Sequence, residues 1–577
     1  MMGNQRMIRR NRPASRARWT LVMALTASAQ LAHAACVDNA DRAQAPIAGD
    51  TCLANGSSYL GSGNANNTLL ASGAGSTLTV ANTVTVNPGN VSSSGGQGVV
   101  SAFSGGHVIA QGGVTVIQRG GANSYGISAG GQSATGGTVD IAGPLSVTMS
   151  AAGQFRRAVM ANGATGLVTI GGHTTIRHTG GSGHRGLSAE GGGTIHYTSA
   201  DIDFTARPAA PPDPAIPGDT GSNGIRVLTD SARLHGTGNT DIRVEGTNSI
   251  GLLTNANAES TIDGWLRINV GPNGASAANI QGNATVSIGP NSALNHPTGS
   301  AVVISSAHAT PLVAGPGLTM AAVTGFTYTG AIAPETTLTN ATVTATTLWH
   351  ATSGAEADFT AHGGGYTGTS TQDGTSTLTV TLADAAVWHL NADATLTTLN
   401  LESNGTLEAA SASRTVTGDV KNISGLVDLS GTTPQTGDTF TVGGNHTGGG
   451  GTVRLDTALG DSASPTDVLH ITGDNVNGGN TQLDVRNLGG AGAATTGDGI
   501  LVVQVDGDSS GTFTLANSPL DVGGFRYSLV QVGSHWYLQS QRAPVATAKP
   551  VPTLDAWALA ALAGLLGGVG WRRRRTR

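Results

Sequence analysis

Residues 166–172 read GLVTIGG, a short run in which apolar and polar side chains alternate between glycines. The same pattern returns as GTVDIAG at 137–143 and as ATVSIGP at 284–290. Alternation with a period of two places the apolar side chains on one face of a strand and the polar side chains on the other. Glycine supplies the backbone freedom of a turn. These stretches therefore predict short, half-buried strands that end in tight turns.

A second pattern, a small residue followed by apolar ones, recurs across residues 90–305. Its spacings are 28, 32, 28, 38, 27, 27 and 23 residues, and it begins at Gly98, Gly126, Ala158, Gly186, Gly224, Gly251, Ala278 and Ala301. The longest spacing contains a proline-rich segment, 206–219, which predicts a projecting loop. One turn cannot bury its apolar side alone, so a period near 28 predicts a stacked solenoid. We predict an all-β chain with a right-handed parallel β-helix over 90–440; an array of β-sandwiches is the alternative.

Composition agrees with this fold and limits the function. Glycine accounts for 87 of 577 residues, whereas charged residues make up 11% and aromatic residues 4%. Six arginines precede Ala34 and five follow Trp571, so the remainder has 18 basic residues against 35 acidic ones, a balance of −17. An acidic body argues against nucleic acid as a partner.

The N-terminus has the organisation of an export signal. Residues 1–18 are basic, 19–31 are apolar, and Ala32 and Ala34 form the small-x-small cleavage pattern. We predict a signal peptide over 1–34, with an uncleaved anchor as the alternative. Residues 35–89 are predicted to be an N-terminal cap. Cys36 and Cys52 are the two cysteines, and export favours a disulfide bond between them over two free thiols.

Residues 441–540 carry an ordered series of short motifs. These are Asp467-Val468-Leu469, Leu483-Asp484-Val485, Phe513-Thr514-Leu515, Phe525-Arg526-Tyr527 and Trp536-Tyr537-Leu538, with Val387-Trp388-His389-Leu390 upstream. The series resembles the C-terminal end of pertactin-like autotransporter passengers. The resemblance implies a segment that caps the β-helix and helps it to fold during export. Such passengers continue as an outer-membrane barrel; 37 residues follow Ser540, so we expect the passenger without its barrel.

The last residues show a second resemblance. After a linker at 541–550, the stretch Val551-Pro552-Thr553-Leu554-Asp555-Ala556-Trp557 resembles the IPTL-CTERM sorting signal of Gram-negative surface proteins. We assign the motif to Val551, Pro552, Thr553, Leu554 and Trp557. The apolar run 556–571 predicts a single transmembrane helix, held by the cytoplasmic arginines Arg572, Arg573, Arg574, Arg575 and Arg577. The resemblance implies a sorting and processing membrane protease as a partner; a plain tail anchor is the alternative.

Candidate chemical groups are few. Asp201 with Asp203, and Asp506 with Asp508, alternate along strands, but neither pair has a basic partner nearby in sequence. Two Gly-Asp-Ser triplets, at 460–462 and 507–509, are expected to be turns. The densest histidines, His173, His178 and His184, are expected to be surface residues. We therefore predict no catalytic residues, no cofactor and no metal site.

Two functions remain open. The first is a non-enzymatic protein of the cell surface or outer envelope that acts in adhesion, biofilm or cell contact, with a precursor in the inner membrane facing the periplasm. Its partner would be a host cell, a neighbouring cell or a polysaccharide. The second is a polysaccharide-acting, pectate-lyase-like enzyme on the same scaffold. A groove of convergent carboxylates and arginines would favour the enzyme.

Overall fold

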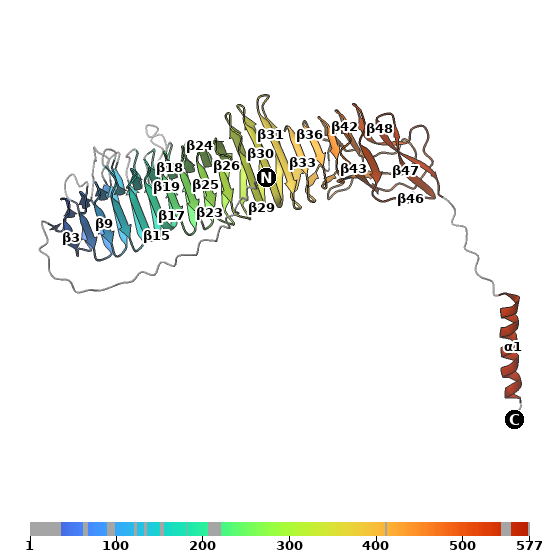
Figure 1. Cartoon of the computed structure of the whole chain (residues 1–577), viewed down its shortest axis with the longest axis horizontal. Coiled ribbons are helices and arrows are strands. Elements are labelled where there is room, and N and C mark those ends of the chain that lie inside the picture. The colour runs from blue at the N-terminus through green and yellow to red at the C-terminus, as the bar shows by residue number, and fades with distance from the viewer. Residues whose placement is uncertain are drawn as a thin grey trace, which may run out of the picture.

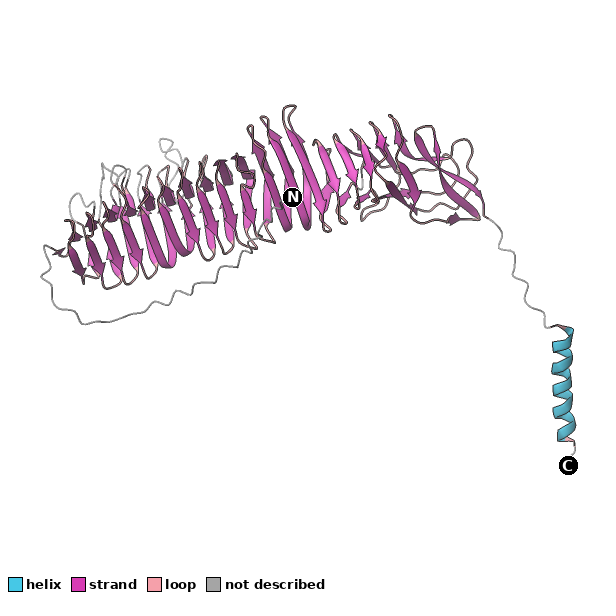
Figure 2. Ribbon diagram, viewed as in Figure 1, coloured by secondary structure: helices cyan, strands magenta, loops and turns pink. Residues whose placement is uncertain are grey.

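The computed structural model describes residues 36–61, 67–88, 98–119, 124–131, 135–150, 155–179, 182–205, 221–409, 412–543 and 555–574. Strands form an elongated rod, and one helix lies near the C-terminus (Figures 1 and 2). Successive turns of the chain contribute to three parallel sheets, which we call the first, second and third sheets.

The first sheet contains the small-apolar repeats. After the short strand β1 (Val37–Asp38), its members are β2 (Ala43–Ala45), β5 (Leu69–Ser72), β8 (Gly98–Phe103), β11 (Tyr125–Ala129), β14 (Arg157–Asn162), β16 (Arg185–Glu190), β18 (Asn223–Leu228), β21 (Ile250–Thr254) and β24 (Ser276–Gly282). Register puts Val100 opposite Ile127 and Ala278 opposite Leu252. In the structure, the repeats that start at Gly98 and Ala278 are therefore shifted by one residue relative to the alignment of repeats that the sequence predicts.

The second sheet contains the strands in which apolar and polar side chains alternate, such as 138–141 and 167–170. Its members are β3 (Thr51–Ala54), β6 (Thr77–Val80), β9 (His107–Ala110), β12 (Thr138–Ile141), β19 (Arg233–Gly236), β22 (Glu259–Ile262), β25 (Thr285–Ile288), β27 (Leu312–Ala314), β31 (Thr377–Ala383), β33 (Thr398–Leu401), β36 (Asp419–Asn422), β39 (His446–Gly448) and β42 (Asn475–Val476). Val168 and Ile170 are buried, as the alternation predicts. At the adjoining corner, a Cβ atom on Gly172 would lie 2.5 Å from the carbonyl carbon of Gly143 in the previous turn. Neighbouring turns approach so closely there that only glycine fits.

The third sheet completes each turn. Its members are β4 (Ser58–Tyr59), β7 (Val84–Val86), β10 (Val114–Arg119), β13 (Leu145–Ser150), β20 (Thr240–Val244), β23 (Leu266–Val270), β32 (Val387–Leu390), β34 (Thr406–Glu408), β37 (Leu426–Asp428), β40 (Thr452–Thr457), β43 (Asn480–Asn487) and β45 (Thr512–Leu515). Longer strands bend from one sheet into the next: β15 (Leu167–Thr179), β17 (Thr194–Phe204), β26 (Ala293–Ser306), β28 (Thr319–Thr329), β29 (Glu335–Thr352) and β30 (Glu356–Gln372). Parallel pairing between turns confirms the β-solenoid over the sandwich array; its right-handedness stays a prediction.

A continuous apolar core fills the rod. Its largest side chains gather midway, where Trp349 lies 4.9 Å from Phe359 and 5.0 Å from Trp388, between ring centroids. All three are 0–1% exposed. These aromatic rings fill the wide turns formed by β29 and β30, where the predicted period becomes irregular.

The C-terminal end of the rod is closed by antiparallel strands. A seven-stranded sheet contains β35 (Arg414–Val416), β38 (Thr439–Val442), β41 (Val468–Ile471), β44 (Ile500–Val505), β48 (His535–Arg542), β47 (Phe525–Val532) and β46 (Leu520–Val522), in that order. The hairpin β47–β48, which we call the cap hairpin, pairs antiparallel with β44. It covers the strand edge that the last parallel turn would otherwise expose.

The predicted transmembrane helix is wrong. A helix, α1 (Ala556–Arg573), does form at the expected place. Its 18 residues include four glycines, and Arg572 and Arg573 occupy its last turn. Within the part of the chain that the structure describes, no helix is long and apolar enough to cross a membrane.

Several predicted features lie outside the described residues. These are the signal peptide with Ala32 and Ala34, the loop 206–219, the motif residues Val551, Pro552, Thr553 and Leu554, and the arginines Arg575 and Arg577. Of the sorting motif, Trp557 is described; it lies in the first turn of α1 and is 86% exposed. Cys36 and Cys52 form the disulfide bond, with their Cα atoms 5.0 Å apart.

Candidate functional site

Charged side chains lie in a row on four neighbouring strands of the third sheet, and we call this group of residues the first ladder. Arg177 Nη1 lies 2.6 Å from Asp203 Oδ2 in the next turn. The carboxylate of Asp241 lies between two arginines, 3.6 Å from Arg243 Nε and 3.5 Å from Arg267 Nη1. The first ladder comprises Arg177, Asp201, Asp203, Asp241, Arg243 and Arg267, from β15, β17, β20 and β23.

The first ladder contains the predicted pair Asp201 and Asp203, for which the sequence suggested no basic partner. The partners come from other turns, because parallel register aligns Arg177 with Asp203. His173 Nε2 also lies 3.4 Å from Asp201 Oδ2. Arg177 precedes Asp203 by 26 residues, close to one period. Projecting the repeat period onto the charged residues would have found this partner.

The size of the first ladder limits its chemistry. The depression that it lines has a volume of about 110 Å³, whereas pockets for organic ligands usually enclose about 300–1,000 Å³. Among the described residues, no group of three or more His, Cys, Asp or Glu side chains could hold a metal ion. The arrangement is that of a surface ion-pair network, in which each exposed pair contributes at most about 1 kcal/mol.

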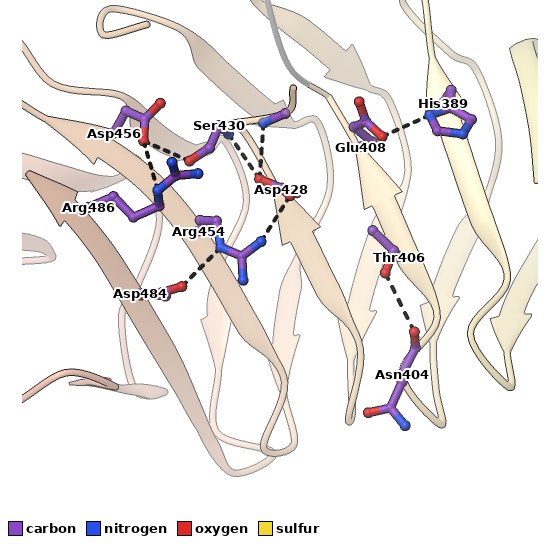
Figure 3. Close-up of polar contacts among 11 residues, drawn as sticks. His389, Asn404, Thr406, Glu408, Asp428, Ser430, Arg454, Asp456, Asp484 and Arg486 are labelled. Carbon is purple, nitrogen blue, oxygen red and sulfur yellow. Dashed lines mark hydrogen bonds and ion pairs between the residues drawn. The ribbon is translucent and has the colours of Figure 1, made fainter. Parts of the chain in front are cut away.

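A second ladder follows the third sheet toward the C-terminus (Figure 3). His389 Nδ1 lies 2.8 Å from Glu408 Oε2. Arg454 then bridges two turns, 3.1 Å from Asp428 and 2.9 Å from Asp484. The hydrogen bond to Asp484 raises the pKa of Arg454 above its ordinary value, and the charge of Asp428 adds to the effect. The second ladder therefore has two parts: His389 and Glu408 join β32 to β34, and Arg454 joins β40 to β37 and β43.

Buried carboxylates lie beside the second ladder. Asp467 is fully buried and accepts backbone N–H groups from Gly437, Asp438 and Asp456, at 2.8–3.0 Å. The pKa of Asp467 is raised to about 6: burial is the largest cause, the backbone hydrogen bonds lower the pKa, and the nearby Asp438 and Asp456 raise it. Asp456 accepts a hydrogen bond from Ser430 Oγ at 2.8 Å, and its Oδ1 lies 3.8 Å from Arg486 (Figure 3). This network positions turns of the backbone.

The remaining carboxylate candidates, Asp506 and Asp508, follow the end of β44 and do not alternate along a strand. Asp506 Oδ2 lies 2.9 Å from His470, whereas the backbone N–H of Asp508 donates to Asp474. In the Gly-Asp-Ser triplets, Ser462 bonds to the backbone of Thr496, and Ser509 accepts a hydrogen bond from Trp536. The serines therefore serve turn and cap structure.

The three clustered histidines are divided between two environments. His173 is exposed on the third sheet. His178 and His184 are buried and stacked, with ring centroids 3.4 Å apart, so the expectation that they are surface residues is wrong. The pKa of His178 is lowered to about 2, mainly by burial and also by His184 and Arg156.

The cap hairpin is attached to the rod through a buried tyrosine. Tyr527 is 1% exposed, and its hydroxyl oxygen lies 2.8 Å from the carbonyl oxygen of Gly460 and 3.1 Å from that of Ala493. The same hydroxyl accepts the N–H of Ala493 at 3.0 Å. Elsewhere in the cap, Trp536 and Phe513 contact edge to face, with ring centroids 5.5 Å apart. All three aromatic side chains belong to the buried core.

Comparison with protein families finds two matches. Residues 415–529 match the family model of the type 1 autochaperone domain. Residues 549–576 match the IPTL-CTERM motif. The first match covers Asp428, Arg454 and Asp484 of the second ladder, the buried carboxylates and the start of the cap hairpin up to Leu529. The second match covers α1 and the segment before it.

Comparison with curated proteins finds autotransporters. The chain is 38% identical over 109 residues to the uncharacterized protein YdeU of Escherichia coli, 18% of this chain and 23% of that protein. It is 37% identical over 167 residues to the probable autotransporter YfaL of Escherichia coli, 27% of this chain and 13% of that protein. It is 40% identical over 114 residues to the adhesin BmaC autotransporter of Brucella suis, 18% of this chain and 3% of that protein. The chain thus spans less than a quarter of the length of these relatives.

Among solved structures, the Haemophilus influenzae Hap adhesin aligns with 80% of this chain and 59% of its own, at 15% identity. The TM-score of 0.31 is too low for an argument from this likeness. The family matches and the relatives agree with the closed β-solenoid. The chain is therefore an autotransporter passenger-like protein with an autochaperone domain and a C-terminal IPTL-CTERM sorting motif.

Proposed function

We propose that this protein is an exported, non-enzymatic adhesin of the cell surface. The observation that carries the proposal is the closed end of the rod, where the cap hairpin covers the last turn; the hairpin begins within the autochaperone-type segment 415–529 and continues beyond it. A rod closed in this way is a stable display scaffold, because the loops at its corners vary without disturbing the stacked core. Relatives such as BmaC are named as adhesins.

The C-terminal motif supports a sorting step. Trp557 is exposed in α1, and the match to the IPTL-CTERM motif spans 549–576. We propose that a processing enzyme of the cell envelope recognises this segment and directs the rod to the surface. The partner of the rod would be a host cell, a neighbouring cell or a surface polysaccharide, in adhesion or in a biofilm.

A second candidate is an enzyme acting on a polysaccharide. The observation in its favour is the first ladder, where carboxylates and arginines share one face of the third sheet. The 110 Å³ volume of the depression weighs against it. The first proposal therefore stands ahead of the second.

One adhesion experiment separates the two functions. Cells lacking the protein would be complemented with the full chain or with a variant in which Asp201, Asp203 and Asp241 are asparagine. An adhesin retains its attachment to cells and to immobilised polysaccharide in the variant, and neither chain shortens a soluble acidic polysaccharide. If the wild-type chain shortens the polysaccharide and the variant does not, the enzyme is correct. If complementation restores no attachment to any of these surfaces, the adhesin proposal fails.

A further inference from the structure

Three arginines and one glutamate lie together on neighbouring strands of the first sheet. Arg157 begins β14 and Arg185 begins β16, and register places these two residues directly opposite each other. Arg226 lies on β18, the strand labelled in Figure 1, and Glu190 ends β16. We call these four residues the arginine cluster.

A single carboxylate serves two of the arginines. Glu190 Oε2 lies 3.5 Å from Arg157 Nη2, and Oε1 lies 3.3 Å from Arg226 Nη1. Ser188 Oγ also donates to Oε1, at 2.8 Å. Arg157 turns its other terminal nitrogen to Tyr125 Oη, at 3.3 Å. The acceptor capacity of Glu190 is thus largely used by these donors.

Glu190 forms no ion pair with the third arginine, Arg185. Arg185 lies within electrostatic range of Arg226, Arg157 and Glu190, and no ion pair joins it to any described residue. The pKa of Arg185 is lowered to about 10, mainly by burial and also by the charges of Arg226 and Arg157, against the raising effect of Glu190. Three guanidinium groups against one carboxylate leave a balance of two positive charges.

Buried donors in the cluster are also unsatisfied. The Nε atoms of Arg157, Arg185 and Arg226 are buried and have no hydrogen-bond partner in the described part of the chain. Arg157 as a whole is only 7% exposed. Leaving a charged donor buried without an acceptor is costly. An oxyanion supplies several acceptor atoms and negative charge at once, and it matches the planar fork of a guanidinium group.

We propose that the arginine cluster binds a small oxyanion of the phosphate or sulfate type, held between adjacent turns of the rod. Access favours an ion over a polymer, because the side chains of Arg157, Arg226 and Glu190 are 9%, 19% and 18% exposed. The bound ion joins β14, β16 and β18, so it stabilises this part of the rod. This site does not depend on the adhesin proposal.

The test uses the full chain, dialysed against chloride. Inorganic phosphate and sulfate are titrated by calorimetry at constant ionic strength, and thermal unfolding is followed in the same buffers. Saturable binding and a rise in Tm are expected with these ions. Arg185→Gln removes one charge-assisted donor set and weakens binding about tenfold to a hundredfold. The matched control Arg233→Gln removes an arginine whose side chain is 66% exposed, and its binding remains at the wild-type level.

Further arms make the test decisive. A sulfated disaccharide that competes with sulfate identifies the oxyanion as part of a saccharide, whereas failure to compete identifies the free ion. The proposal is overturned if the wild-type chain shows no saturable binding, or if Arg233→Gln weakens it equally. A competing explanation is that carboxylates of the chain itself neutralise the arginine cluster; Asp213 and Asp219, outside the described residues, are the candidates. The proposal is overturned in favour of this explanation if the wild-type chain does not bind the ion and the variant with asparagine at both positions does. If Arg185→Gln fails to fold by circular dichroism, the wild-type titrations decide.

Discussion

Replacing Tyr527 with phenylalanine is expected to loosen the cap hairpin without creating a cavity. The change removes only the hydroxyl, which is bonded to the carbonyl groups of Gly460 and Ala493 and to the N–H of Ala493. Tyr527 is 1% exposed, so water cannot readily replace the lost partner. Leaving buried backbone groups unsatisfied costs about 1–3 kcal/mol. The opening equilibrium of the cap should therefore rise about fivefold to 150-fold.

Hydrogen exchange of the amides in β47 and β48 measures this opening directly. Tyr537→Phe is the matched control, because Tyr537 lies in the same hairpin, is half-buried, and makes no hydroxyl hydrogen bond to another described residue. Faster exchange is expected in Tyr527→Phe and wild-type exchange in Tyr537→Phe. Equal rates in the two variants would refute the assignment of Tyr527 as the attachment between the cap hairpin and the rod.

Three further predictions concern the core, the buried carboxylates and the N-terminal end. Trp349→Ala should cost about 3–5 kcal/mol in urea unfolding, because the ring is 0% exposed against Phe359; a loss below 1 kcal/mol would contradict the packing. The pKa of Asp467 rises from 3.8 to about 6 on folding, so between these pH values the folded state binds this proton more tightly than the unfolded state. The free energy of unfolding should therefore fall by about 1–3 kcal/mol as pH rises from about 4 to 6. A pH series on wild-type and Asp467→Asn chains measures this, and an identical slope in both would disprove it. Replacing Cys36 and Cys52 by alanine removes the cross-link between residues 16 positions apart and should destabilise the first turns by about 2–4 kcal/mol. Limited proteolysis of these turns should become faster, and an unchanged rate of digestion would contradict the prediction.

The sequence predicts the solenoid and its closed end well, because both depend on local patterns. Alternation in stretches such as 166–172 identifies strand faces, and the period follows from the repeats. The register between strands is harder to predict where the sequence pattern does not show which side chains face the core. All six residues of β8 are buried, so Val99 and Val100 are equally good candidates for the column that contains Ile127.

The polar sites could not be predicted in the same way, because their members lie in different turns. Asp203 meets Arg177 across 26 residues, and the arginine cluster joins positions 157, 185 and 226. The repeats that start at Ala158 and Gly186 already align Arg157 with Arg185. The ion pairs of Glu190 with Arg157 and Arg226 depend on side-chain positions, which the repeats do not give. The C-terminal helix shows the opposite error, since a local apolar run suggested a span that its glycines and arginines do not support.

The most direct test of the surface-exposed rod is protease shaving of intact cells, with identification of the released peptides. The account predicts peptides from the rod, 98–409, and from the autochaperone segment, 415–529, while periplasmic marker proteins remain intact. The release of these peptides only after the outer membrane is opened would contradict the central claim that the rod stands outside the cell.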